Sequence, residues 1–150
     1  MKFTYNFVVE APIEQVWKLL DDVPRAARLM PGIESVKPHG QDTYEATLRV
    51  RIGPMGFDLT GLIHLSTDRN LGKWRITAQA EDPRIGGGIA ANIETEISQP
   101  SSDETAICLN ADVNFLGRFG QLGQPLIKKK SDAMVQEFTE NLRKAILDMG

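Results

Sequence analysis

Three consecutive glycines in the middle of the chain have the spacing of a phosphate-binding loop. Gly86, Gly88 and Ala91 fit the pattern Gly-x-Gly-x-x-Ala, in which amides at a helix N-terminus hold a dinucleotide pyrophosphate. That chemistry requires a helix directly after the glycines. Residues 89–97 are instead apolar at every second position, which predicts a strand. We therefore interpret the glycines, Gly87 included, as a bend between two strands, where missing side chains permit positive φ.

The other reactive side chains form no catalytic or metal-binding pattern. Nucleophilic catalysis by Cys108, the only cysteine, needs a neighbouring base. Ile107 and Leu109 are predicted to point inward, so the thiol between them points outward, and no base is recognisable beside it. His39, in a predicted turn, and His64, on the outward face of a strand, lack the spacing of metal ligands. The sequence therefore predicts no catalytic residue, no metal site and no cofactor.

The bulk composition is that of an ordinary globular domain. The chain has 150 residues, 41% of them hydrophobic and 25% charged, which fits a single domain over residues 1–150. A formal net charge of −3 argues against nucleic acid as a partner, because phosphate binding needs a basic surface. No apolar run reaches the roughly 20 residues of a membrane span, so membrane contact is expected to be peripheral. One cysteine and the lack of a signal-peptide pattern favour a cytoplasmic location, with any membrane contact at the inner face.

The hydrophobic pattern predicts a sheet covered by one long helix. A strand over residues 2–10 is followed by two short helices between residues 12 and 31. Six further strands, with alternating apolar and polar residues, are predicted within residues 34–115. Apolar residues return at helical spacing over residues 126–146. The expected fold is α+β, a curved antiparallel sheet of about seven strands wrapped around the C-terminal helix, because only this helix is large enough to cover the sheet.

Small residues at inward positions leave room between the predicted sheet and helix. Ala46, Gly61, Ala78, Ala91 and Ala111 all fall on the apolar side of their strands. Apolar pockets that bind small molecules commonly have volumes of about 300 to 1,000 Å³. Aromatic and methionine side chains can equally fill such a space, so the pattern leaves open whether a cavity exists.

Four segments of the chain carry a resemblance to a known family. In chain order they are "APIEQVWKLLDD", "LMPGIESV", "YEATLRVRIGPMGFDLTGLIHL" and "QLGQPLIKKKSDAMVQEFTENL". They resemble the carbon monoxide dehydrogenase G-subunit family, which belongs to the START-like (SRPBCC) helix-grip superfamily. The resemblance covers essentially the whole chain. It implies a helix-grip fold and a protein that binds a small hydrophobic ligand, a quinone or a fatty lipid, without being an enzyme. It also implies support or recruitment of a carbon monoxide dehydrogenase-type molybdenum hydroxylase at the membrane. Many members carry a tail after the last helix that this sequence does not show, so ligand binding is better supported than membrane tethering.

The resemblance and the inward pattern together give candidate site residues. The expected lining of the cavity consists of large apolar side chains, namely Trp17, Leu48, Val50, Phe57, Leu59, Ile63, Trp74, Ile76, Ile93, Leu109, Val113, Phe115, Ile127, Met134 and Phe138. The expected cavity mouth consists of adaptable or flexible residues near turns, namely Met30, Pro31, Met55, Gly86, Gly87, Gly88 and Leu122.

The one basic run lies at the start of the predicted long helix. Lys128, Lys129 and Lys130 spread over different helix faces, as solvated lysines do. A sharper hypothesis is that they face a membrane, where each basic residue adds roughly 1 kcal/mol of attraction to anionic headgroups.

Two other functional classes fit the same fold. A cyclase or dehydratase-like enzyme of the superfamily requires polar groups converging inside the cavity, where the inward set offers mainly Tyr44, Trp74 and Thr95. A pure protein adaptor requires a filled core and an exposed apolar patch.

Overall fold

The computed structural model describes residues 1–149 and confirms the predicted order of one strand, two short helices, six strands and a long helix. It adds a short 3-10 helix, η1, that the sequence did not predict. The elements are β1 (Lys2–Val9), α1 (Ile13–Asp21), α2 (Val23–Ala27), β2 (Ile33–Pro38), β3 (Thr43–Ile52), β4 (Met55–Asp68), β5 (Lys73–Asp82), β6 (Gly87–Ser101), β7 (Glu104–Gly117), η1 (Arg118–Leu122) and α3 (Gln124–Met149).

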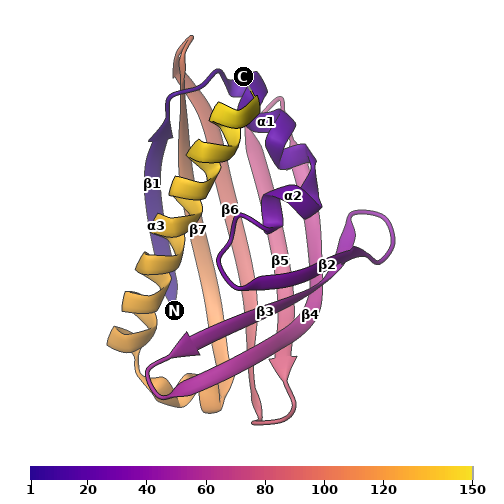
Figure 1. Cartoon of the computed structure of the whole chain (residues 1–150), viewed down its shortest axis with the longest axis vertical. Coiled ribbons are helices and arrows are strands. Elements are labelled where there is room, and N and C mark those ends of the chain that lie inside the picture. The colour runs from indigo at the N-terminus through magenta and orange to yellow at the C-terminus, as the bar shows by residue number, and fades with distance from the viewer. Residues whose placement is uncertain (150) are drawn as a thin grey trace.

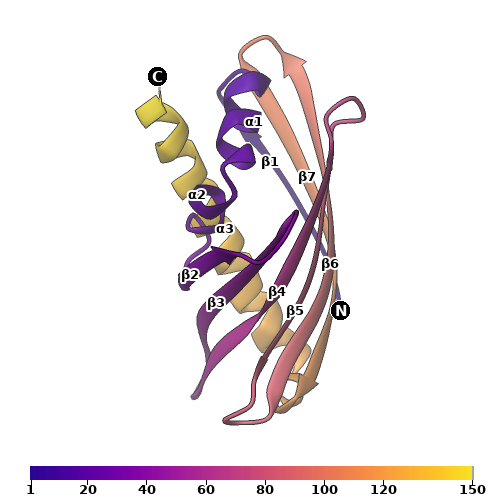
Figure 2. The ribbon, with the colours of Figure 1, turned by 90° about the vertical axis from the view of Figure 1, so that its right-hand side faces the viewer.

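The seven strands form one antiparallel sheet in the order β1-β7-β6-β5-β4-β3-β2. The sheet curves, and α3 lies across its concave face (Figure 1). Figure 2 shows that α1 and α2 lie on the same side of the sheet as α3 and that β2 and β3 curl toward that helix. This is the predicted α+β helix-grip architecture.

The two short helices begin where the sequence provides helix starts. Pro12, with extended backbone angles, immediately precedes α1, and the Asp22 carboxylate accepts a 3.4 Å hydrogen bond from the amide of Arg25 at the start of α2. Helix α1 buries Val16 and Leu19 against the sheet. These helices therefore close the upper end of the molecule as Figure 1 is drawn.

Two hydrophobic clusters form where the sheet, the helices and η1 meet. The upper cluster consists of Val9, Ala11, Val16, Trp17, Leu19, Leu20, Ala26, Ile97, Ile107, Leu142 and Ile146. The lower cluster consists of Phe3, Val50, Ile52, Phe57, Leu59, Ala111, Phe119 and Ile127. Helix α3 spans both, because it contributes residues near its start to the lower cluster and residues near its end to the upper one.

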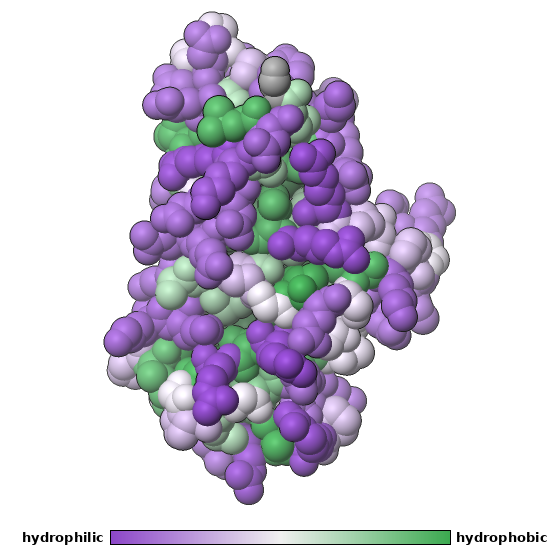
Figure 3. Space-filling view, in the orientation of Figure 1, coloured by the Kyte–Doolittle hydropathy of each residue, from purple (hydrophilic) through white to green (hydrophobic). Residues whose placement is uncertain are grey.

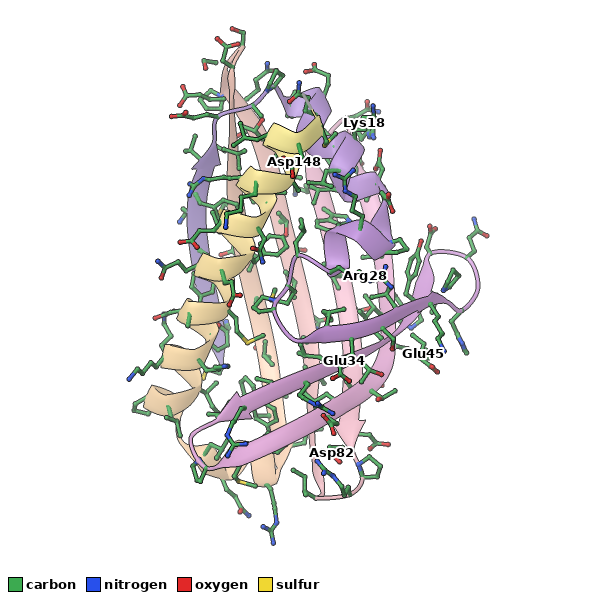
Figure 4. All side chains as sticks on the ribbon, in the orientation of Figure 1. Lys18, Arg28, Glu34, Glu45, Asp82 and Asp148 are labelled. Atoms are coloured by element: carbon green, nitrogen blue, oxygen red, sulfur yellow. The ribbon has the colours of Figure 1, made fainter. Side chains whose placement is uncertain are left out.

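A buried carboxylate fixes the lower end of the sheet. The pairing of β4 with β5 begins at Thr60 and Glu81, and beyond it the Asp82 side chain, 3% exposed, accepts a 2.9 Å hydrogen bond from the amide of Asp58. Hydrogen bonds from Arg84 and from that amide lower the pKa of Asp82. Figure 4 shows Asp82 at the lower end of the molecule, near the last residues of its strand. The Asp82 carboxylate thus adds one hydrogen bond between β4 and β5 beyond the end of their backbone pairing.

The glycine bend lies at this lower end, and its expected role as a cavity mouth stays a prediction. Gly86 has a φ of 69°, and β6 starts directly after it, which confirms the bend between two strands. Gly87 and Gly88 are buried, and a Cβ at Gly87 would lie 2.9 Å from the ring of Phe57. The Phe57 and Phe119 rings stack at 4.4 Å between centroids. The missing side chains therefore let aromatic rings close this end.

Candidate ligand-binding site

Beside the two clusters, other inward side chains of the sheet and of α3 remain partly accessible. We call these half-buried residues the inner band; the ten of them that the sequence predicted as cavity lining are Leu48, Ile63, Trp74, Ile76, Ile93, Leu109, Val113, Phe115, Met134 and Phe138. Inward side chains of a closed core are normally fully buried, as those of both clusters are. The inner band is therefore less completely covered than the two clusters are.

Small residues on the inner face explain why the inner band stays open. In the strand register Ala78 is opposite Ala91, and Gly61 is opposite both Ala46 and Ala80. On α3, Phe138 packs against the upper cluster and Met134 against the lower one. The small side chains on the sheet therefore face a part of the helix between its two packed ends.

Five of the predicted lining residues are core rather than accessible lining. Trp17 lies in the upper cluster, 6% exposed, with the Arg69 guanidinium 5.3 Å from its ring centroid. Phe57, Leu59 and Ile127 are buried in the lower cluster, at 1%, 1% and 4% exposure. The sequence pattern marks them as inward-facing, but it did not show η1, whose Phe119 stacks on Phe57. The fifth, Val50, is also buried in the lower cluster and lies at the edge of the opening described next.

An opening of about 120 Å³ lies between α3 and the β2–β3 edge, and we call it the α3–β3 gap. It is lined by Pro31, Gly32, Arg49, Val50, Lys130, Ala133, Met134 and Glu137. The Arg49 amide donates a 2.8 Å hydrogen bond to the Gly32 carbonyl, and a side chain at Gly32, where φ is 92°, would overlap Arg49. Glycine is therefore required to bring the loop before β2 against β3. Apolar surface appears in the seam between α3 and α2 just above this region (Figure 3).

The structure brings together some of the predicted mouth and basic residues and separates others. Pro31 and Lys130 line the α3–β3 gap, with Met30 directly before it in the chain. Met55 and Leu122 pack against the lower cluster and do not line the α3–β3 gap, and their mouth role stays a prediction. Ala133 and Glu137 were missed, although both lie within one or two turns of Lys130 and share its side of the helix, a spacing that helical periodicity could have revealed.

The opposite side of α3 is bonded to β1 through what we call the Tyr5 cluster. The Tyr5 hydroxyl donates to Asp132 Oδ1 at 2.7 Å and accepts from Ser131 Oγ at 2.7 Å. Lys128 pairs with Asp132, and its Nζ lies 5.2 Å from the Tyr5 ring centroid. Farther along α3, the Arg143 guanidinium donates a 2.8 Å hydrogen bond to the Val8 carbonyl. Lys128 is thus engaged with β1, although its side chain, like that of Lys129, is exposed.

Charges within the Tyr5 cluster shift one another's pKa values. Burial raises the pKa of the Tyr5 hydroxyl. The hydrogen bond from Lys128 holds the pKa of Asp132 below its usual range, and the same bond raises the pKa of Lys128. The cluster is therefore fully formed through the neutral pH range.

Outside the inner band, Cys108 and His64 are the side chains with potential for chemistry, and both lie on the outer face of the sheet. Cys108 lies on the outer face of β7, and the exposed His64 ring accepts from or donates to Thr43 at 3.0 Å. Within residues 1–149 no group of three or more His, Cys, Asp or Glu side chains is arranged to hold a metal ion. Across the same residues no helix combines the length and apolar character needed to span a bilayer. The expectations of no catalytic residue and no cofactor stay predictions.

The family model for the G subunit of carbon monoxide dehydrogenase (CoxG) matches residues 6–147. The chain belongs to this family. A comparison with curated proteins gave no match.

Solved structures with low sequence identity share the fold of this CoxG family member. A conserved protein from Geobacillus kaustophilus is 16% identical with a TM-score of 0.90, over 99% of this chain and 96% of that one. A START superfamily protein from Mycobacterium smegmatis is 12% identical with a TM-score of 0.69, over 99% of both chains. The ZhuI aromatase/cyclase from Streptomyces sp. R1128 is 19% identical with a TM-score of 0.64, over 99% and 92%. The START-like helix-grip fold is therefore shown.

Proposed function

We propose that this chain binds one small apolar molecule, a quinone or a fatty lipid, in the inner band. The observation that carries the proposal is the half-buried band of apolar side chains beside two closed clusters. Removing an apolar guest from water stabilises the complex by about 25 cal/mol per Å² of apolar surface buried. A guest lying between Met134 on α3 and Ile63 on the sheet would cover surface that both side chains leave accessible.

Family membership supports one class of partner. The match to the CoxG family favours a role beside a molybdenum hydroxylase of the carbon monoxide dehydrogenase type. In this role the chain would carry or present its guest to the enzyme system at the inner face of the membrane. Peripheral contact is supported by residues 113–131, which contain four basic and no acidic residues.

Native mass spectrometry of the purified protein, combined with lipid extraction, tests ligand binding. We expect an isoprenoid or acyl chain to co-purify, or an added quinone to bind with a stoichiometry of one. An empty protein that also fails to bind added quinones would overturn the proposal.

Vesicle flotation tests the membrane contact separately. We expect the Lys129→Glu and Lys130→Glu double variant to lose binding to vesicles containing anionic lipid. Lys144→Glu, an exposed change near the other end of α3, is the control and is expected to bind as the unmodified protein does. Equal binding by all three proteins would remove the membrane contact and leave ligand binding standing.

The expectation that the chain is not an enzyme stays a prediction. One similar structure is that of an aromatase/cyclase, and its likeness to this chain shows the fold alone. Recovery of an added guest chemically unchanged after prolonged incubation is the outcome that we expect. A protein-dependent new product would favour the cyclase or dehydratase-like alternative, and failure to bind any guest would favour the adaptor.

A further inference from the structure

One buried polar side chain on the inner face of the sheet has no hydrogen-bond partner among the described residues. Thr95 is 5% exposed and lies on β6 between Ile93 and Ile97, which point inward. In the strand register it is directly opposite Trp74 on β5 and Leu109 on β7. Both of these neighbours belong to the inner band.

Thr95 differs in this respect from the other buried polar residues. The Thr105 hydroxyl donates to the Ala11 carbonyl at 2.8 Å, and the Thr139 hydroxyl donates to the Val135 carbonyl at 2.8 Å. Asp82 accepts hydrogen bonds from Asp58 and Arg84. Within residues 1–149, Thr95 Oγ1 makes no hydrogen bond of this kind. No side-chain nitrogen or oxygen in this part of the chain is both fully buried and without a partner, so the Thr95 hydroxyl keeps some accessible surface. The Thr95 hydroxyl therefore borders the unfilled space of the inner band.

Because its hydroxyl keeps accessible surface, Thr95 can hydrogen-bond to water or to a polar atom of a guest. Trp74 is directly opposite Thr95 in the strand register, and its indole N–H is a second donor group. Thr95 and Trp74 thus place two residues with donor groups at neighbouring positions on the same, otherwise apolar, face of the sheet.

We infer that Thr95 and Trp74 form a hydrogen-bonding subsite for a neutral acceptor oxygen, such as a carbonyl, on the apolar guest. The inference rests on the proposed function and adds where the polar group of the guest lies. The charged neighbours along these strands point to the outer face, where Arg75 pairs with Glu94 at 3.0 Å. The inward neighbours of Thr95 on the sheet, Trp74 and Leu109, carry no charge, so a neutral carbonyl fits this position better than an ionised carboxylate.

Two probes that differ only in their oxygens test this subsite. 2,3-Dimethyl-1,4-naphthoquinone carries two carbonyls, its substituted ring positions prevent addition of the Cys108 thiol, and 2,3-dimethylnaphthalene is its hydrocarbon counterpart. Equilibrium dialysis gives the affinity of each probe for the full chain and its variants. Thr95→Val keeps the shape of the side chain and removes the hydroxyl. We expect it to weaken quinone binding about ten-fold, the value of one hydrogen bond, and to leave hydrocarbon binding unchanged.

Three further variants separate hydrogen bonding from packing. Trp74→Phe keeps an aromatic ring, removes the second donor and is expected to weaken quinone binding selectively, so it serves if Thr95→Val does not fold. Thr95→Ser retains the hydroxyl and is expected to retain the preference for the quinone. Thr77→Val makes the matched change on the exposed outer face of β5 and is expected to alter neither affinity.

The remaining outcomes of this experiment would overturn either the subsite alone or the proposed function as well. Equal weakening for both probes, or no change for either, would overturn the subsite while leaving apolar binding intact. Failure of the unmodified protein to bind either probe would overturn the proposed function and the subsite with it.

Discussion

The two long sides of α3 are attached to the sheet in different ways. On the β1 side, the Tyr5 cluster and the Arg143 bond to the Val8 carbonyl join helix and strand. On the β2–β3 side, no hydrogen bond or ion pair within residues 1–149 joins α3 to either strand, and the α3–β3 gap lies between them. The nearest bond there runs from Asn141 to the Leu29 carbonyl at 2.9 Å, above the gap.

This difference identifies the side on which a guest can pass. Small outward movement of α3 at the gap breaks no polar contact between described residues, whereas movement on the other side separates Tyr5 from Ser131 and Asp132. We therefore expect guests to enter between α3 and β3 while the β1 side stays closed.

Blocking the gap is expected to have the largest effect. In a Cys108→Ser background, Ala133→Cys is labelled with a bulky maleimide, which places the label at the lining of the gap. We expect uptake of the naphthoquinone probe, followed by stopped-flow fluorescence quenching, to slow at least ten-fold. The matched control carries the same label at Gln136→Cys, on the exposed face of α3, and is expected to take up the probe at the unmodified rate. Equal rates for the two labelled proteins would place the entrance elsewhere.

Removing the bonds of the β1 side is expected to cost stability. Tyr5→Phe deletes both hydroxyl contacts, and we expect the free energy of unfolding to fall by about 1 kcal/mol, or the Tm by about 3 °C. Tyr44→Phe is the matched control, because Tyr44 is half-buried on β3 and its hydroxyl has no hydrogen bond to another described residue. The same loss of Tm in both variants would contradict the claim that polar contacts attach α3 to the sheet on the β1 side.

The pH dependence of that stability difference is expected to be the smallest effect. The Asp132 pKa is lowered by folding, so its contribution is present above its unfolded pKa of about 3.9 and is lost as the pH falls through the folded value. The Tyr5 and Lys128 pKa values are raised, so their contributions are present below about pH 10 and are lost as the pH rises through the folded values. The Tm difference between Tyr5→Phe and the unmodified protein is therefore expected to be constant from about pH 5 to 9 and to shrink outside that range. A difference that changes steeply near pH 7 would show that another group controls the cluster.

Most of the fold was predictable because its signals are local. Period-two alternation identified the strands, the change to helical period after Gly120 identified α3, and Pro12 and Pro24 marked the starts of the short helices. The 3-10 helix was missed because five residues, one of them a glycine, carry no periodic signal.

The site was predicted only in part because alternation reports which face a residue is on and not what covers that face. Phe57 and Leu59 share the inward alternation of Ile63 and Ile93, but tertiary packing buries the first two and leaves the others accessible. The bonding of Lys128 to β1 likewise depends on Tyr5, which lies more than 120 residues away in the chain. The pairing of those elements is visible only in the folded structure.

Methyl NMR of the protein labelled at isoleucine tests the central claim, that an apolar guest lies in the inner band. During titration with 2,3-dimethyl-1,4-naphthoquinone, we predict the largest shifts at the methyl groups of Ile63, Ile76 and Ile93. The methyl groups of Ile52 in the lower cluster and Ile146 in the upper cluster should barely move, because both clusters are closed. Binding accompanied by shifts at Ile52 or Ile146 and none in the inner band would contradict the claim.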